Sequence, residues 1–373
     1  MTRPRLLHLH STFNLGGKEA RCVQLINAFG DAFEHEIVSG MPEQVGAMAL
    51  IESGVPARLR DDFPLLSGPL GLARLRDIGR AIAAGGYDLV LTYNFGSLDG
   101  ALANRLHAGV PHVHHEDGFN EDEAVRQKPA RVIYRRLAIG KAHRLVVPSR
   151  NLERIAYAVW KQPRDKVAYV PNGVDMSLFD TPPAADAIPG FERPDGDVVV
   201  GTLAGLRAVK NLPRLVRAFA AAARANPDVP SRLVIVGRGP AEDRIKATAQ
   251  TEGIADRLLM PGFLAYPHRY VGLFDVFALS SDSEQFPISL VEAMAAGLPA
   301  ASTDVGDVRE ILSEPNRDLI GDEAALTTAL TRLIGDPALR ATLGAANRAK
   351  VAGDYSADRM ISTYRSIYEG AMR

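Results

Sequence analysis

Glu284 and Glu292 flank the expected start of a helix, and their arrangement is the first feature of the sequence that suggests chemistry. Pro287 suits the first turn of this helix, and Gly297 suits its end. The free backbone N–H groups of the first turn, from Ile288 to Leu290, form a natural anion site, while carboxylates can bind hydroxyls. A nucleotide-sugar needs this combination. The alternative is a pair of solvated helix charges, which is more common for two isolated glutamates.

Two cations, Arg207 and Lys210, lie in the loop that follows the first predicted strand of the same half of the chain. Cations at a strand end would stabilise the negative charge that develops on a leaving diphosphate. As solvated charges at a helix start they would oppose the helix dipole, so a bound anion explains them better. A turn containing Gly237 follows the next strand, although any tight strand-to-helix turn favours glycine.

The first half of the chain carries a glycine pair and a histidine cluster after predicted strands. Gly16 and Gly17 follow the first strand and open a helix, as a generic turn would also do. His112 and His114 share one face of a later strand, and His115 points to the other face. Three interpretations remain open for these histidines. The histidines could ligate a metal, although the sequence shows no matching set of further ligands downstream. They could instead be ordinary core or rim residues, or one of them could act in a cleft.

Together these segments resemble the retaining glycosyltransferases of the large group-4 family, which have the GT-B fold. The resemblance runs from Gly16 to Gly297 and so covers most of the chain. It implies that Glu284 contacts the transferred sugar and that Glu292 binds the ribose hydroxyls of the donor. It also implies that Lys210 binds the donor diphosphate.

Two positions depart from the pattern of the family. Gly205 stands where the family usually has an arginine, and Arg207, two residues later, is expected to replace it. Asp117 takes a place that is often filled by histidine, whereas His114 matches the family histidine that hydrogen-bonds the donor sugar. The predicted catalytic residues are His114, Arg207, Lys210 and Glu284. The predicted donor-binding residues are Gly16, Gly17, Gly237, Phe286, Pro287, Ile288, Ser289, Leu290 and Glu292.

Short apolar runs alternate with amphipathic helical patterns along the whole chain, which indicates parallel sheets covered by helices. The predicted fold class is α/β, with two doubly wound Rossmann-like domains facing across a cleft. The acceptor-side domain is expected over 1–180, a Pro- and Gly-rich linker over 181–197, and the nucleotide-sugar-binding domain over 198–355. The resemblance implies that a final helix within 356–373 crosses back to the first domain. Ligands of such sheets bind beyond the carboxyl ends of the strands.

The composition excludes several other classes of protein. The chain has 373 residues, a formal net charge of −1 and a single cysteine, Cys22. The near-zero charge argues against nucleic acid as a partner, and one cysteine allows neither an intrachain disulfide nor a Cys-rich zinc site. The start lacks the apolar core of a signal peptide, and no run reaches the roughly 20 apolar residues of a membrane span. We therefore expect a cytoplasmic protein. The basic stretch 126–150 is interpreted as a solvated face, with peripheral docking on anionic lipid at the inner face of the membrane as the alternative.

The predicted function is transfer of a sugar, with retention, from a nucleotide-diphosphate donor to a hydroxyl acceptor such as a glycan or a lipid-linked glycan. This activity belongs to polysaccharide or glycoconjugate biosynthesis and is expected to need no metal and no cofactor. Three alternatives stay open. A GT-B-fold epimerase would form product without an acceptor, and a silent nucleotide-sugar-binding protein would bind donor without turnover. A metal-dependent hydrolase using His112 and His114 would lose its activity to a chelator.

Overall fold

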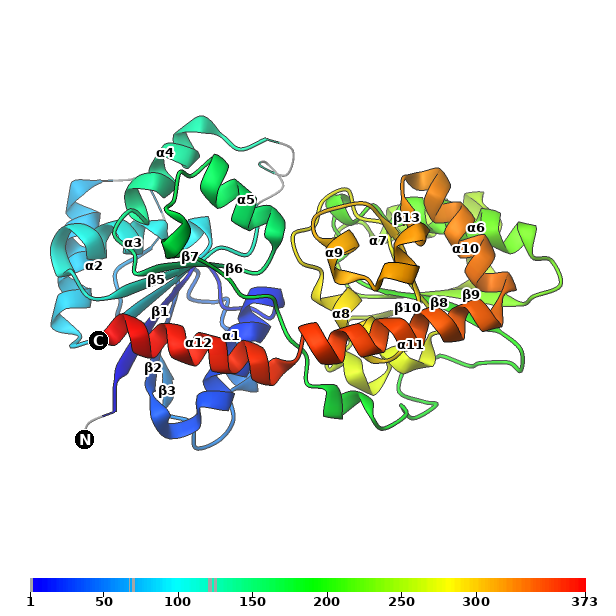
Figure 1. Ribbon diagram of the computed structural model, residues 1–373, viewed down its shortest axis with the longest axis horizontal. Helices are drawn as coiled ribbons and strands as arrows, with labels where there is room; N and C mark the ends of the chain where they lie inside the picture. Colours follow the sequence, from blue (N-terminus) through cyan, green and yellow to red (C-terminus); the bar gives the residue numbers. More distant parts are fainter. Residues whose placement is uncertain (1–2, 67, 69–70, 120–122, 124–125) are drawn as a thin grey trace. The chain divides into compact units, whose positions relative to one another are not determined.

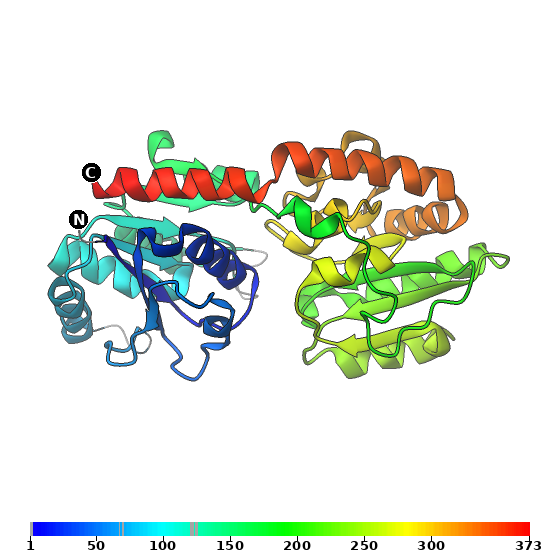
Figure 2. The ribbon, with the colours of Figure 1, turned by 90° about the horizontal axis from the view of Figure 1, so that it is seen from below.

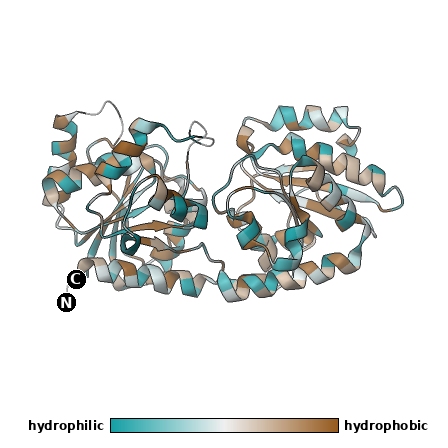
Figure 3. Cartoon of the chain, turned by 45° about the horizontal axis from the view of Figure 1, so that its top comes forward, coloured by the Kyte–Doolittle hydropathy of each residue, from teal (hydrophilic) through white to brown (hydrophobic). Residues whose placement is uncertain are grey.

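The computed structural model describes the chain except for residues 1–2, 67, 69–70, 120–122 and 124–125. The chain divides into two compact units, one made of Met1–Asn172 with Arg359–Arg373 and the other of Gly173–Asp358. Each unit is a parallel sheet with helices on both faces (Figure 1), which confirms the predicted α/β class. Apolar residues concentrate on the strands and on the helix faces that cover them (Figure 3).

The first unit has a seven-stranded parallel sheet in the order β3-β2-β1-β4-β5-β6-β7. Its strands are β1 (Arg5–His10), β2 (Glu34–Ser39), β3 (Ala57–Leu59), β4 (Leu89–Tyr93), β5 (His112–His115), β6 (Arg144–Val147) and β7 (Val167–Tyr169). Its helices are α1 (Gly17–Phe29), α2 (Leu72–Ala84), α3 (Leu98–Ala103), α4 (Pro129–Ala138), α5 (Arg150–Ala158) and most of α12 (Ala357–Met372).

Side-chain alternation along the strands gives this sheet two buried faces. On β1, Leu6 packs in a core with α1 and α12, whereas Leu7 and Leu9 pack in a separate core with α2. The helix α12 contributes buried side chains to the first of these cores, and Figure 2 shows it, in red, running along the first unit. The strand order reverses between β1 and β4, where an α/β sheet opens a binding crevice.

The second unit has a six-stranded parallel sheet in the order β10-β9-β8-β11-β12-β13. Its strands are β8 (Val198–Leu203), β9 (Ser231–Val236), β10 (Leu258–Gly262), β11 (Val276–Leu279), β12 (Ala300–Thr303) and β13 (Ile320–Gly321). Its helices are α6 (Leu212–Ala225), α7 (Glu242–Thr251), α8 (Ile288–Ala295), α9 (Val308–Ile311), α10 (Glu323–Gly335) and α11 (Pro337–Asp354). Here the strand order reverses between β8 and β11.

The chain passes into the second unit directly after Asn172. Val174 forms a parallel bridge with Ser356, and Arg348 pairs with Asp180 at 2.6 Å. Residues 173–180 therefore pack with the second unit, as do parts of the stretch 181–197, in which Ile188 is buried in that unit's core. Among the described residues, no helix is both long and apolar enough to cross a bilayer.

Candidate functional site

The loops at the carboxyl ends of β8 and β11 are joined by hydrogen bonds. The Ser280 hydroxyl donates to the Lys210 carbonyl at 3.0 Å, and the Asp282 amide donates to the Val209 carbonyl at 2.8 Å. These bonds bring two predicted site residues together, because Lys210 forms an ion pair with Glu284. The Ser281 hydroxyl also donates to Glu284, at 2.7 Å. The predicted cation and the predicted sugar-binding carboxylate thus lie side by side at the switch point of the second sheet.

A glycine that the sequence reasoning missed holds the Glu284 loop in place. Gly306 has a positive φ of 55°, and a Cβ there would lie 2.3 Å from the Glu284 carbonyl oxygen. Next to it, the Asp307 amide donates to the Gln285 carbonyl at 3.2 Å. The signal available in the sequence was a glycine three residues after the end of a strand, but its closeness to a loop some twenty positions earlier was not visible.

Glu292 lies inside α8 and is set apart from the other glutamate of the pair. Its carboxylate has no hydrogen bond and no ion pair among the residues that the structure describes. Burial raises the pKa of Glu292 from its ordinary 4.5 to about 8. The side chain of Tyr270 lies close enough for the Glu292 charge to raise the pKa of that phenol, after burial itself. An unpartnered and partly buried carboxylate can accept hydrogen bonds from the hydroxyls of a ligand.

The first turn of α8 presents backbone rather than side chains. Pro287 precedes the helix, and no side chain caps its N-terminus. Phe286 and Leu290 are buried in the core of the second unit, so they can meet a ligand only through their main chain. Ile288 and Ser289 are partly exposed at the first turn. The Leu290 N–H donates to the Pro287 carbonyl at 3.1 Å, so the predicted anion site is reduced to the Ile288 and Ser289 N–H groups, for which no partner appears among the described residues.

The glycine-rich turn after β9 has a structural reason. Gly237 has a φ of 151°, and a Cβ there would lie 1.8 Å from the carbonyl oxygen of Ala204. Gly239 has a φ of 155°, and a Cβ there would lie 2.6 Å from the carbonyl oxygen of Leu206. The turn must be made of glycine because the loop after β8 crosses directly over it. Gly237 therefore shapes the loop that carries Arg207 and Lys210.

Arg207 is exposed, and its side chain makes no hydrogen bond or ion pair with any residue that the structure describes. Gly205 is also exposed and has no positive φ. A Cβ at Gly205 would have the Arg207 Nε at 3.7 Å as its nearest neighbour, which is ordinary contact. A Cβ at position 205 would thus be accepted without moving the backbone, and Arg207, which has no partner among the described residues, can turn toward a ligand.

In the first unit, Gly16 and Gly17 are exposed at the start of α1, where Gly16 is the N-terminal flanking residue. Lys18 pairs with Glu19, and burial raises the pKa of Glu19. A Cβ at Gly16 would lie 2.9 Å from the Glu19 carboxylate, which is the flexible end of a side chain and could shift to make room. One turn further along α1, the buried Arg21 donates hydrogen bonds to the Asp117 carboxylate through Nη1 and Nη2, the second at 2.9 Å.

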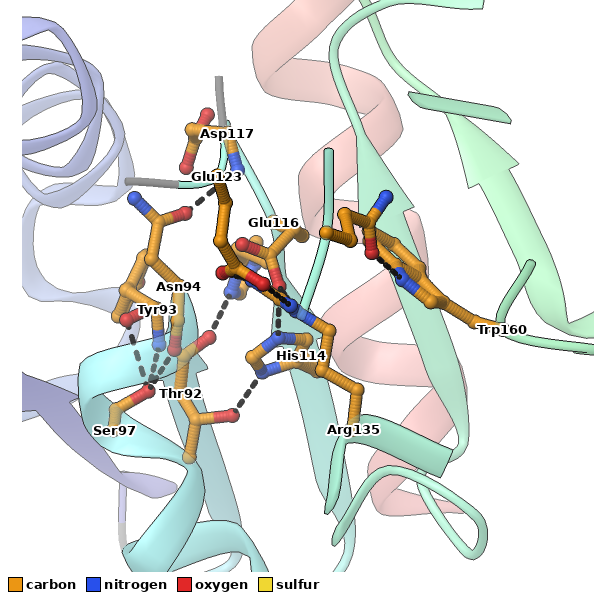
Figure 4. Close-up of polar contacts among 12 residues, drawn as sticks. Thr92, Tyr93, Asn94, Ser97, His114, Glu116, Asp117, Glu123, Arg135 and Trp160 are labelled. Atoms are coloured by element: carbon orange, nitrogen blue, oxygen red, sulfur yellow. Dashed lines mark hydrogen bonds and ion pairs between the residues drawn. The ribbon is translucent and has the colours of Figure 1, made fainter. Parts of the chain in front are cut away.

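His114 lies in a buried polar network rather than on a surface (Figure 4). It is 0% exposed, with Nδ1 at 2.7 Å from the Thr92 hydroxyl and Nε2 at 3.5 Å from Glu116. His112 contacts the same Thr92 hydroxyl at 2.7 Å through Nε2, so the two histidines do share one face of β5. His115 lies on the other face, where it stacks on Tyr93 at 4.5 Å.

Arg135 closes the network around His114. Its guanidinium lies 3.2 Å from Glu116 and 3.2 Å from Glu123, and it sits within 5.4 Å of the ring centres of Phe119 and Trp160. Arg135 is only 1% exposed. The interpretation of the basic stretch 126–150 as a solvated face is therefore wrong at this residue, because two buried carboxylates compensate its charge.

The comparisons with known proteins agree with this architecture. The family described as glycosyl transferase 4-like domain matches residues 16–173, and the family described as glycosyl transferases group 1 matches residues 186–350. The chain is 31% identical over 213 residues to the putative glycosyltransferase EpsF of Bacillus subtilis, covering 55% of this chain and 54% of that protein. It is 26% identical to a D-inositol 3-phosphate glycosyltransferase of Stackebrandtia nassauensis, covering 69% of this chain and 63% of that protein. The chain thus spans less than two thirds of the length of these curated relatives.

Solved structures show the fold at lower identity. Anabaena HepE in complex with UDP and glucose is 19% identical, with a TM-score of 0.81 over 99% of this chain and 100% of that one. The sucrose-phosphate synthase of Thermosynechococcus elongatus is 21% identical, with a TM-score of 0.77 over 98% of both chains. With family matches over both of its parallel α/β units, the chain belongs to the group-4 family of glycosyltransferases and has the GT-B fold.

Proposed function

We propose that this protein transfers a sugar, with retention of anomeric configuration, from a nucleotide-diphosphate donor to a hydroxyl acceptor in glycoconjugate biosynthesis. The observation that carries the proposal is the edge of the second sheet. There Lys210 pairs with Glu284 in the loop that leads into α8, whose N-terminus has no side-chain cap among the described residues. Glu292, which has no partner among those residues either, lies further along the same helix. Cations and free N–H groups suit a diphosphate, and carboxylates suit the hydroxyls of two sugars.

In this proposal Lys210, Arg207 and the first amides of α8 stabilise the diphosphate as it leaves. The bond from the anomeric carbon to the diphosphate oxygen breaks, a bond to the acceptor oxygen forms, and the acceptor proton passes to the diphosphate or to water. Glu284 accepts hydrogen bonds from the transferred sugar, and Glu292 accepts them from the ribose. When the diphosphate binds Lys210, it competes with the ion pair between Lys210 and Glu284. The Glu284 carboxylate can then accept hydrogen bonds from the hydroxyls of the sugar.

The base and the sugar of the donor are tested first with uridine compounds. HepE of Anabaena has been solved with UDP, with UDP and glucose, and with UDP-glucose, which makes these the natural first probes here. A ligand that binds only the folded protein raises its melting temperature. We expect UDP to raise it, with Glu292→Gln lowering the gain. A melting temperature that no nucleoside diphosphate changes would refute the donor site.

In the first unit, His114 acts in this proposal through its position. Its ring is fully buried between Thr92 and Glu116, so it supports the backbone at the end of β5 rather than offering a free surface. The acceptor is assigned to this unit and is a glycan or a lipid-linked glycan. No metal or cofactor takes part in the transfer we propose, and turnover should persist in a chelator.

The exposed side of α4 supports peripheral contact with a membrane. Ile133 and Leu137 lie one turn apart and are 56% and 50% exposed, with Lys141 exposed shortly after them. Sedimentation with vesicles that contain anionic lipid tests this contact. We expect wild type to sediment and the double variant Ile133→Ser, Leu137→Ser to stay in solution, and equal behaviour of the two would remove the membrane from the proposal.

A silent nucleotide-sugar-binding protein is the second candidate, and Gly205 is the observation that favours it. The loop there lacks the arginine of the family, and the side chain of Arg207 is unpaired within the described part of the chain. Donor binding with no turnover against any acceptor would establish this second function.

A further inference from the structure

A cluster of soft metal-ligating side chains is buried in the first unit, outside the residues used above. His8 and His10 are alternate residues of β1 and point to the same face, and Cys22 lies on α1, which covers that face. None of the three is more than 2% exposed. One ligand atom from each lies within 4.8 Å of the others, and no other group of His, Cys, Asp and Glu in the described part of the chain has this spacing.

The two sulfur–nitrogen separations in this cluster match those around a tetrahedral zinc ion. Cys22 Sγ lies 3.5 Å from His8 Nδ1 and 3.7 Å from His10 Nε2. Zinc bonds of about 2.3 Å to sulfur and about 2.1 Å to nitrogen, at a tetrahedral angle, place those two atoms about 3.6 Å apart. The Tyr93 hydroxyl lies 3.0 Å from His8 Nδ1 and 3.5 Å from Sγ, where it can supply a fourth donor.

A neighbouring histidine orients the first ligand. His8 Nε2 lies 2.9 Å from His35 Nδ1, so one of these nitrogens donates to the other. When His8 is the donor, its Nδ1 keeps a lone pair that faces the thiol, which is how second-shell partners set a metal-binding tautomer.

Hydrogen bonds within the cluster leave these polar groups poorly satisfied. The thiol has one proton for three neighbours, and its contacts of 3.5 to 3.7 Å are those of a weak donor. A cation between the three ligands would use the lone pairs that now face one another.

We propose that His8, His10 and Cys22, together with the Tyr93 hydroxyl, bind one Zn²⁺ ion in the core of the first unit. On binding, the thiol loses its proton to solvent and a zinc–thiolate bond forms, with no change of oxidation state. The adjacent dication supplies the stabilisation that a buried thiolate needs. The ion ties β1 to α1 on either side of the Gly16–Gly17 turn, so its role is structural and independent of the sugar transfer.

Metal analysis of the full-length protein tests the site. The protein is expressed in medium supplemented with zinc, dialysed against EDTA and analysed by mass spectrometry for metals. Because the site is closed to solvent, we expect about one zinc ion per chain to survive dialysis. The variants Cys22→Ala and His10→Gln should lose it. The matched control His112→Gln changes another buried histidine, which lies outside the cluster, and should keep it.

Cobalt gives a readout that does not depend on the variants folding. Wild-type protein produced with Co²⁺ in place of zinc should show a thiolate-to-cobalt charge-transfer band in the near ultraviolet and the strong visible bands of tetrahedral cobalt. Circular dichroism checks that each variant is folded. Wild-type protein that holds neither zinc nor cobalt, or a cobalt spectrum that Cys22→Ala leaves unchanged in a folded protein, would overturn the proposal.

Discussion

Replacing Glu292 by glutamine changes donor binding and protein stability in opposite directions. The wild-type carboxylate is partly buried, has a pKa of about 8 and lacks a partner among the described residues. Glutamine keeps the shape and one oxygen acceptor but removes the charge. A hydrogen bond to a charged group contributes about 1.5–3 kcal/mol, against about 1 kcal/mol for a neutral one. With one or two ribose hydroxyls bound, the variant should lose roughly 1–3 kcal/mol of donor affinity, or about five- to 150-fold.

The stability effect follows from the raised pKa. The folded state holds the Glu292 proton more tightly than the unfolded state, so the contribution of this group to stability falls as the pH rises from about 4.5 to about 8. At 1.36 kcal/mol for each pH unit, the penalty at pH 8 is at most about 5 kcal/mol, and less for a side chain that is partly exposed. Glu292→Gln should therefore unfold at a higher urea concentration than wild type at pH 8, and at the same concentration near pH 4.5.

Donor affinity should also change with pH as the Glu292 carboxyl group ionises. The ionised carboxylate is the better acceptor, so wild-type affinity for UDP should rise from pH 6.5 to pH 9, while the affinity of Glu292→Gln stays flat. Calorimetric titration of UDP across this range measures both. Glu314→Gln, at an exposed position of the same unit, is the matched control and should behave as wild type. Unchanged UDP affinity in Glu292→Gln at pH 9 would refute the assignment of Glu292 to the donor site.

Three other residues or pairs are tested by turnover and unfolding. Arg207→Ala and Lys210→Ala should each slow turnover more than tenfold, since each 1.4 kcal/mol lost in the transition state is about tenfold. Unchanged turnover in Arg207→Ala, together with strongly slowed turnover in Lys210→Ala, would show that Lys210 acts alone. His114→Ala should lower turnover strongly and leave Glu116 without one partner, which costs about 1–3 kcal/mol in urea unfolding. Full turnover in folded His114→Ala would reduce this histidine to a core residue. Arg135→Ala leaves two buried carboxylates without their cation and should lower the free energy of unfolding by about 3–5 kcal/mol. A decrease below about 1 kcal/mol would contradict the network.

The strand–helix alternation was predictable because it follows from local patterns of apolar and polar residues. The strands around Leu6, Leu89 and Val276 are apolar runs bounded by turns, and they form as expected. The strands β3 and β13 have three and two residues, too few to show a period. The region of α4 was interpreted only as part of the basic stretch 126–150, because arginines interrupt its apolar positions. Its buried Arg135 is stable only through carboxylates that lie 12 and 19 positions away.

The candidate site was predictable in its residue types but not in its pairings. The sequence placed Lys210 and Glu284 at strand ends, yet their ion pair joins residues 74 positions apart. Likewise, His112 and His114 drew attention as a metal motif, whereas the spacing of metal ligands occurs in His8, His10 and Cys22. That cluster combines a strand and a helix, and only the fold brings Cys22 next to His8 and His10.

The central claim, transfer of a sugar from a nucleotide donor with retention, is tested most directly by proton NMR of the reaction. The enzyme is incubated in a chelator with a UDP-sugar and a panel of glycan and lipid-linked glycan acceptors. We expect UDP to appear in step with a new glycoside whose anomeric configuration is that of the donor, and Lys210→Ala to slow both. A glycoside of inverted configuration would contradict the account, as would a UDP-sugar that binds but is never consumed with any acceptor.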